Sequence, residues 1–374
     1  MRPTSEAAVA EMIARADGPL SIRGGGTRGF DALGTLLETG GLSGIPLYDP
    51  GSLTLVAQAG TPLAEIEAAL EAEGQRLAFE PMDHRGLLGS TGVPTIGGVI
   101  AANISGPRRI QAGAARDFLL GVRFVDGLGR VVKNGGRVMK NVTGYDLVKL
   151  MAGSHGTLGV LTEVSLKVLP KPEAAACVRV KGLGDADAVT AMARALGSPF
   201  DVTGAAHMPA GMDGNPVTMI RIEGFEGSVA YRAGKLQAMF GGQDVTVESD
   251  SEQVAAGWHR VRDVEAMHGS GGDVWRVSVK PSDAPAFVDA LRQRGAVKRV
   301  LYDWGGGLIW VETEPGDDIR PSGFKGHATL IRASADTRQR LARFHPEPAP
   351  VAALTRGVRQ KFDPRGILNP GLMS

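Results

Sequence analysis

Hydrophobic residues recur along the first 170 residues with helical spacing in some stretches and strand-like density in others. Ala, Val, Met and Ile alternate with charged residues over 5–16, which predicts a short amphipathic helix. A second helix is expected over 61–74, with Thr61 as its cap, Pro62 in its first turn and Gly74 at its end. Strands are expected at 20–22, 52–59, 75–80, 119–126, 130–133 and 160–169.

After the linker signal Pro170-Lys171-Pro172 the pattern changes to strand–helix–strand–strand, and it occurs twice, within 177–248 and within 274–311. This repetition predicts a two-part α+β domain with an antiparallel sheet. Trp304 and Trp310 share the phase of one strand-like run, so one face of that run is expected to be domain core. The alternative is a partner surface.

The C-terminal part of the chain predicts a short helix followed by a tail. A helix is expected over 337–344, and 361–371 is turn-rich, which indicates an extended end.

Length and composition narrow the class of protein. A chain of 374 residues suggests two domains. A formal net charge of +1 argues against nucleic-acid binding, which needs a basic surface. Cys177 is the only cysteine, which excludes an internal disulfide and a cluster held by several cysteines of this chain. The N-terminus lacks the apolar run of a signal peptide and no apolar stretch could cross a bilayer, so we expect a cytoplasmic protein, peripheral at the inner membrane only through partners.

Glycine-rich segments punctuate the first half of the chain. They are 23–27, 95–106, and the pair 143–146 and 153–159. Glycine lets backbone N–H groups crowd around an anion, so three such segments in one domain favour a phosphate-bearing cofactor. The spacing of Gly24, Gly26 and Gly29 imitates a dinucleotide fingerprint, but 30–34 does not look like the helix that a Rossmann unit requires there.

These segments, in this order, resemble the FAD domain of the vanillyl-alcohol oxidase/PCMH family. The pieces that carry the resemblance are Ile22–Thr27, Thr95–Gly98, Arg116–Gly121, Thr143–Leu147, Gly156–Thr162 and the tail Phe362–Gly371. The resemblance implies an α+β protein whose PCMH-type FAD-binding domain, in two subdomains, spans 1–172. It further implies an α+β cap domain with an antiparallel sheet over 173–345, and a C-terminal segment, 346–374, that packs back on the FAD domain.

The resemblance also implies which residues contact FAD. The segments 23–27 and 95–106 would hold the pyrophosphate, and 156–160 would run near the adenine and ribitol. The expected cofactor residues are Arg23, Gly24, Gly25, Gly26, Thr27, Thr95, Ile96, Gly97, Gly98, Ala101, Asn103, Ser105, Gly106, Gly144, Tyr145, Gly153, Gly156, Thr157, Gly159 and Val160.

Within that family the chain is similar to the FAD-binding subunits of bacterial glycolate oxidase (glycolate dehydrogenase). Glu80–Asp83, Lys140–Asp146 and His327–Ala333 suggest this. The similarity implies oxidation of glycolate to glyoxylate in a complex with a homologous flavoprotein subunit and an iron–sulfur subunit.

Two departures from the family pattern affect the chemistry. Related 2-hydroxy-acid dehydrogenases carry metal-binding histidines in the cap, whereas the comparable stretch here, 303–310, has none, and we expect no metal site. This favours the interpretation that the chain alone does not oxidise glycolate, or that it is an accessory scaffold with structural or absent flavin; a stand-alone oxidase of another hydroxy acid is a third possibility. Some relatives attach FAD to a histidine after the first glycine loop, where this chain has Arg28-Gly29-Phe30, so non-covalent FAD is expected.

A few side chains have two competing interpretations. Arg23 would either bind the pyrophosphate, which we favour, or form a surface salt bridge. His84 would be an acid or base near the flavin or, in the favoured interpretation, a loop histidine. Tyr145 would pack on the cofactor or fill the core. Arg116 and Asp117 are expected to form an ion pair that fixes the loop after Gly106. No residue is assigned as the catalytic base.

Overall fold

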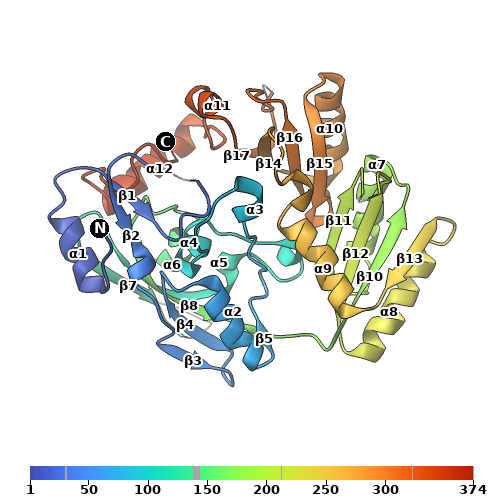
Figure 1. The fold of residues 1–374 in the computed structure, drawn as a ribbon, viewed down its shortest axis with the longest axis horizontal. Coiled ribbons are helices and arrows are strands. Elements are labelled where there is room, and N and C mark those ends of the chain that lie inside the picture. The colour runs from blue at the N-terminus through green and yellow to red at the C-terminus, as the bar shows by residue number, and fades with distance from the viewer. Residues whose placement is uncertain (30–31, 138–143, 212, 322, 374) are drawn as a thin grey trace. The chain divides into compact units, whose positions relative to one another are not determined.

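The computed structural model describes residues 1–29, 32–137, 144–211, 213–321 and 323–373. Contacts within the chain divide it into two compact units (Figure 1). Unit 1 comprises 1–105, 113–171 and 347–374, and unit 2 comprises 106–112 and 172–346. The sequence placed its boundaries after 172 and 345 and did not anticipate that 106–112 would pack with the second unit.

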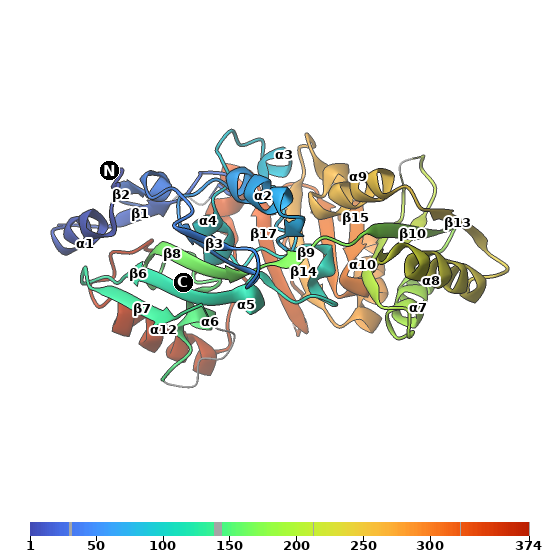
Figure 2. The same cartoon turned by 90° about the horizontal axis from the view of Figure 1, so that it is seen from below.

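Unit 1 is built on a five-stranded antiparallel sheet in the order β3-β4-β8-β6-β7, seen in Figure 2. Its strands are β3 (Leu47–Asp49), β4 (Thr54–Gln58), β6 (Leu119–Val125), β7 (Val131–Gly135) and β8 (Val160–Lys167). A separate parallel pair joins β1 (Leu20–Arg23) to β2 (Thr35–Glu38). The helices of this unit are α1 (Glu6–Ala14), α2 (Leu63–Ala72), α3 (Arg85–Leu88), α4 (Ile96–Ala101), α5 (Ala115–Phe118), α6 (Leu147–Met151) and α12 (Ala349–Phe362).

Local sequence explains the first helix of this unit. The Ser5 hydroxyl accepts a hydrogen bond from the Ala8 amide at 3.2 Å and caps α1. Val9 and Ile13, one turn apart, are fully buried against Leu20 and Leu37 in one core cluster.

Two details of the sequence prediction for unit 1 were wrong. The Thr61 side chain does not cap α2; it donates to the carbonyls of Gln58 and Gly44 instead. The strand expected over 75–80 is only β5 (Gln75–Arg76), because its partner β9 (Leu169–Pro170) has two residues and ends on a proline, which has no N–H to donate.

The C-terminal tail returns to unit 1, as the family resemblance implied. Leu368 forms a parallel bridge with Leu20 of β1, and the Leu20 amide donates to the Ile367 carbonyl at 2.7 Å. The helix α12, which precedes this tail, was not predicted. None of its residues is buried, so its sequence carries no strong core-facing stripe.

Unit 2 contains one eight-stranded antiparallel sheet in the order β13-β10-β12-β11-β15-β16-β14-β17. Its strands are β10 (Ala174–Lys181), β11 (Val202–Met208), β12 (Val217–Gly224), β13 (Asp244–Glu248), β14 (Asp273–Val279), β15 (Val297–Asp303), β16 (Leu308–Thr313) and β17 (Gly326–Arg332). The order is the same in both halves, with β10 to β13 corresponding to β14 to β17. The two halves meet where His207 of β11 pairs with Tyr302 of β15. The expected repeat is therefore confirmed.

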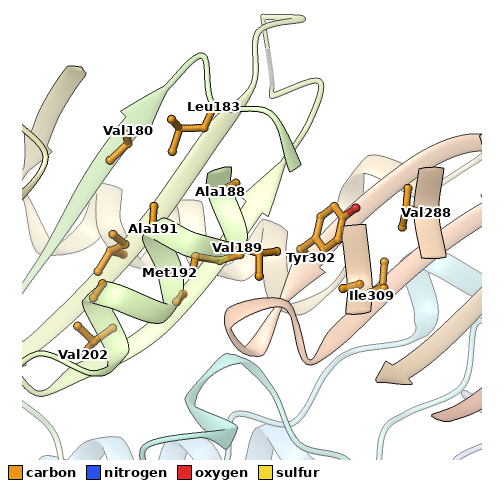
Figure 3. Close-up of a cluster of buried hydrophobic side chains, with 14 of the residues drawn as sticks. Val180, Leu183, Ala188, Val189, Ala191, Met192, Val202, Val288, Tyr302 and Ile309 are labelled. Atoms are coloured by element: carbon orange, nitrogen blue, oxygen red, sulfur yellow. The ribbon is translucent and has the colours of Figure 1, made fainter. Parts of the chain in front are cut away.

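Three helices cover one face of this sheet and enclose its core. They are α7 (Asp185–Leu196), α8 (Glu226–Met239) and α10 (Ala284–Gln293). Figure 3 shows Val189 and Met192 of α7 and Val288 of α10 among these buried side chains, with Tyr302 and Ile309 from the sheet. Burial of this apolar surface is the main stabilising contribution in the unit.

The other elements of unit 2 depart from the prediction. The helix expected over 337–344 is α11 (Ala335–Arg340), while α9 (Ser251–Arg262) and β17 were not predicted. Trp310 is 4% exposed within β16, as expected for a core residue, but Trp304 follows the end of β15 in a short 3-10 turn. No helix among the described residues is long and apolar enough to cross a membrane.

Candidate cofactor-binding site

Three segments far apart in the sequence line one cavity of unit 1. The first is the loop after β1, the second is α4, and the third is the turn between α6 and β8, joined by the C-terminal tail. The predicted cofactor residues that line the cavity are Arg23, Gly24, Gly25, Gly26, Thr27, Gly97, Gly98, Ala101, Gly156 and Gly159.

The first segment depends on glycine because two backbones pass very close to each other. A Cβ atom on Gly25 would lie 1.5 Å from the carbonyl oxygen of Val93, and one on Gly24 would lie 2.7 Å from the hydroxyl of Thr95. No side chain fits at Gly25 without a shift of the backbone. The glycine loop is therefore shaped by the segment that leads into α4.

The second segment is the N-terminal part of α4. The Thr95 hydroxyl accepts from the Gly98 amide at 3.3 Å and caps the helix. Gly97 allows α4 to approach β4, because its Cβ would lie 2.6 Å from the carbonyl oxygen of Ala59. Ile96 faces the core and is fully buried. Only Gly97, Gly98, Ala101 and Ala102 of this stretch line the cavity.

The third segment is held by a residue of the C-terminal tail that the sequence analysis did not assign. The Asn369 side chain accepts from the Ile22 amide at 2.6 Å and donates to the His155 carbonyl at 2.8 Å. One amide group therefore ties β1 to the turn that contains Gly156. Asn369 and His155 both line the cavity. In the sequence, the only indication of this role was that Asn369 lies in the turn-rich tail that contributes to the family resemblance.

Arg23, which the sequence predicted to bind the pyrophosphate, is engaged in a salt bridge. The Arg23 guanidinium pairs with the Glu38 carboxylate at 2.8 Å, with both side chains about a third exposed (38% and 36%). The salt bridge, which the sequence analysis ranked second, is thus present, although Arg23 also lines the cavity.

Arg28, which the sequence analysis did not assign to the cofactor, lies against the second segment. A Cβ on Gly98 would approach its guanidinium to 2.9 Å. Its Nε is shielded from solvent and has no hydrogen-bond partner among the described residues. Burial lowers the pKa of Arg28 to about 10 against the attraction of Asp83, so the side chain is still charged at neutral pH. An unpartnered buried donor in a cavity is typical of a ligand contact.

The remaining predicted cofactor residues lie outside the cavity lining. Asn103 and Ser105 hold the loop before α5, since their side-chain oxygens accept from the amides of Arg116 and Ala115. Gly153 donates its amide to the Ile100 carbonyl. Thr157 is buried and donates to the Ser154 carbonyl, and Val160 is fully buried in the core.

Gly106 was placed in the wrong unit by the sequence analysis. It packs with unit 2, where its carbonyl accepts from the indole N–H of Trp304 at 3.0 Å. The reason is that the following turn, Pro107–Arg109, is anchored there by an ion pair between Arg108 and Glu223.

The segment around Gly144 is only partly described. Thr143 and the rest of 138–143, which carried part of the family resemblance, lie outside the described residues. Gly144 has a positive φ of 81°, and Tyr145 is 87% exposed, so the idea that this tyrosine fills the core was wrong. Neither residue lines the cavity.

Two further expectations concern loop side chains. His84 is buried beside the Met82 carbonyl at 3.3 Å and is not among the residues that line the cavity. Arg116 and Asp117 do approach each other at 3.8 Å, but both are about half exposed. The Asp117 carboxylate instead fixes the loop by accepting from the Ala114 amide at 2.8 Å. No group of three or more His, Cys, Asp or Glu side chains that could hold a metal ion occurs among the described residues.

Comparisons with known proteins identify the family of the chain. The FAD binding domain family matches residues 1–135. The chain is 36% identical over 364 residues to the glycolate oxidase subunit GlcE of Escherichia coli, covering 95% of this chain and 92% of that protein. It is also 36% identical over 162 residues, 41% of this chain and 33% of the relative, to the glycolate oxidase subunit GlcD of Bacillus subtilis.

The fold is shared with a solved structure of low sequence identity. Alkyldihydroxyacetonephosphate synthase superposes with a TM-score of 0.71 at 16% identity, over 100% of this chain and 77% of the synthase. The solved structure shows the fold, and the near full-length match to GlcE shows the family. This chain belongs to the FAD-binding family of the glycolate oxidase subunit GlcE, whose members are FAD-dependent oxidoreductases that act on CH–OH groups.

Proposed function

We propose that unit 1 binds FAD non-covalently in the cavity lined by its three glycine-rich segments. The observation that carries the proposal is that these segments, which are far apart in the sequence, meet at one cavity. Gly24, Gly25, Gly26, Gly97 and Gly98 line the cavity without side chains, so a pyrophosphate can approach the backbone closely there. The amides of Gly97 and Gly98 themselves donate to the Ala59 carbonyl and the Thr95 hydroxyl. Arg28 supplies a buried positive charge with an unused donor.

The cofactor and the chain contribute different parts of the function. Bound FAD supplies a two-electron acceptor for the oxidation of an alcohol carbon. The chain binds and orients it: Asn369 fixes β1 against the turn at Gly156, and Thr95 fixes α4. Non-covalent binding follows from Arg28 and Gly29, which stand after the first loop in place of a histidine.

We further propose that the chain acts as the FAD-binding subunit of a complex that oxidises glycolate to glyoxylate. Similarity to GlcE over nearly the whole chain supports this, and similarity to GlcD supports a homologous flavoprotein partner. Electrons would leave through an iron–sulfur partner, since the chain's own cysteine, Cys177, is single and buried and cannot hold a cluster by itself.

A second candidate is an accessory subunit whose flavin is structural. One observation favours it: the stretch 303–310 has no histidine with which to orient a hydroxy acid through a metal. Under this alternative, glycolate would be oxidised at the flavin of the homologous partner.

The test compares the isolated chain with the assembled complex. The chain is expressed alone and with its neighbouring subunits, visible flavin spectra are recorded, and glycolate is added without oxygen. We expect yellow protein in both preparations and bleaching by glycolate in the complex. A colourless, folded isolated chain would contradict independent FAD binding. If the flavin of this chain stays oxidised in a complex that turns over glycolate, the accessory role is correct.

A further inference from the structure

Unit 2 contains two arginines that share one aromatic ring. The guanidinium carbon of Arg276, on β14, lies 5.0 Å from the centre of the Trp304 ring, and that of Arg109 lies 5.9 Å from the same ring. Both distances are within the range of a cation–π interaction. The carboxylate of Asp303, next to Trp304 in the chain, attracts the Arg276 guanidinium there.

The ring is held in place by a strained turn. Trp304 has a φ of 53°, in the left-handed region that a bulky residue rarely adopts, and it is followed by two glycines of positive φ. The Asp303 carboxylate accepts from the Trp304 amide at 2.7 Å, and the indole N–H donates to the Gly106 carbonyl. Strain that the surroundings maintain in this way is concentrated at functional positions.

Arg276 differs from the other arginines that are shielded in this unit. Arg108 pairs with Glu223 at 2.6 Å, and Arg320 pairs with Asp318 at 2.8 Å. In the part of the chain that the structure describes, Arg276 forms no ion pair and no hydrogen bond. Burial lowers the pKa of Arg276 to about 10, with Asp303 acting against this and Arg109 adding to it. A shielded guanidinium without an acceptor is suited to an anionic ligand.

The neighbours of Arg276 in the sheet add a hydroxyl and an apolar wall. Thr329 of β17 and Trp310 of β16 are its direct cross-strand partners, so both project from the same face of the sheet. Thr329 is half-buried and provides one donor and one acceptor. On this face, therefore, Arg276 has the Trp310 indole on one neighbouring strand and the Thr329 hydroxyl on the other.

We propose that Arg276, Arg109, Trp304 and Thr329 form a binding site for a small 2-hydroxy acid. Arg276 donates to the carboxylate, Arg109 adds positive charge, and the Thr329 hydroxyl pairs with the 2-hydroxyl group. In this proposal the two arginines orient the carboxylate, a role that the stretch 303–310 cannot perform through a metal because it has no histidine. The choice of 2-hydroxy acid rests on the proposed function, whereas the anion site rests on unit 2 alone.

The test measures ligand binding, not turnover, on the full-length chain. Glycolate and acetate are titrated calorimetrically into wild type, Arg276→Gln, Arg276→Lys and Thr329→Val, with thermal unfolding as a check of folding. Arg179→Gln is the matched control, because Arg179 lies on β10 of the same sheet but pairs with Glu248 at 3.5 Å. We expect Arg276→Gln to weaken glycolate binding at least about tenfold, Arg276→Lys to weaken it less, and Arg179→Gln to leave it unchanged. Thr329→Val should remove the preference for glycolate over acetate.

A second readout keeps the site testable if a variant does not fold. Phenylglyoxal modifies accessible arginines, and we expect glycolate to protect the peptide that contains Arg276 in the wild-type chain. Wild type that binds no glycolate, or Arg276→Gln that binds it as tightly as wild type, would overturn the site. Flavin content is measured in the same samples, so loss of FAD with intact glycolate binding would count against the proposed function and leave this site standing.

Discussion

The cavity of unit 1 and the sheet of unit 2 differ in what forms their surfaces: glycine backbone in the cavity and buried charged side chains in the sheet. In unit 1 the proposed cofactor surface consists largely of glycines, so three segments line one cavity with few side chains. In unit 2 charged side chains are buried, and nearly every one that is described has an opposite charge or an indole against it. Among the described residues, Arg28 of unit 1 has an Nε without a hydrogen-bond partner, and Arg276 of unit 2 has an indole but no ion-paired carboxylate or hydrogen-bond acceptor against it. Both arginines are candidate ligand contacts.

This difference teaches where mutations should act. Ligand binding at a surface of glycine backbone should be lost when a substitution adds a side chain. The stability of a network of buried charges should fall when a substitution removes one partner of an ion pair. An unpartnered cation should cost stability without its ligand and contribute affinity with it.

The largest effect should come from adding atoms to the first glycine loop. Gly25→Asp places a side chain where even a Cβ would lie 1.5 Å from the Val93 carbonyl oxygen, and it adds negative charge beside the phosphates. We expect at least about a tenfold loss of bound flavin, measured from the visible spectrum per mole of protein. Gly18→Ala is the control, since nothing lies within 4 Å of the added atom. Full flavin retention in Gly25→Asp would refute the assignment of this loop.

The next effect should come from removing one partner of a buried ion pair in unit 2. Arg108 and Glu223 are 2.6 Å apart, and their side chains are 11% and 5% exposed. Arg108→Ala should lower the free energy of unfolding by about 3 kcal/mol, because the buried Glu223 carboxylate would lose its 2.6 Å partner, while its pairing with Arg221 is longer, at 3.7 Å. Urea denaturation measures this change. The double variant Arg108→Met with Glu223→Gln should recover most of the loss, and no recovery would show that packing, not charge, was removed.

A smaller effect is expected at Arg28, where a substitution should weaken FAD binding but stabilise the apoprotein. Arg28→Gln should weaken FAD binding about tenfold or more, the value of one charge-assisted hydrogen bond. The same change should raise the melting temperature of the apoprotein, because it removes a shielded charge whose Nε has no partner among the described residues. Flavin titration and differential scanning fluorimetry measure the two effects.

Arg23→Gln is the comparison for this variant. It removes a salt bridge between two side chains that are each about a third exposed, so it should change apoprotein stability by less than about 1 kcal/mol. If Arg23→Gln weakens FAD binding more than Arg28→Gln does, Arg23 binds the pyrophosphate, as the sequence predicted, and the assignment of this role to Arg28 is wrong.

The smallest effect should be a loss of stability in acid from the charge network of unit 2. Burial alone would raise the pKa of Asp185, but contacts with His207, Tyr302 and Arg292 outweigh it and lower the pKa to about 2. The carboxylate therefore stabilises the fold above about pH 4, its unfolded pKa, and this contribution is lost as the pH falls toward 2. We expect about 1 kcal/mol, since solvent screens the carboxylate in part. Asp185→Asn should flatten the unfolding free energy between pH 4 and 2, and an unchanged slope would contradict this role.

The sequence by itself determined the elements whose signals are local. The strand–helix–strand–strand repeat of unit 2, with α7 as its first helix, was visible in the pattern of apolar runs. The glycine-rich segments indicated a phosphate-bearing cofactor, because a close approach of ligand to backbone requires residues without side chains. The resemblance of these segments to a known family indicated that the cofactor is FAD.

Only the tertiary structure decided which of those residues share a cavity and which charges find partners. Asn369 reaches Ile22 across 347 positions, and Gly106 belongs to the second unit. Arg23 pairs with Glu38, while the Nε of Arg28 has no hydrogen-bond partner among the described residues. None of these pairings has a local signature, because a hydrogen bond or ion pair between distant segments depends on how the chain folds back on itself. The sequence therefore indicated the glycine-rich segments that line the cavity, and the tertiary structure determined which side chains lie beside them.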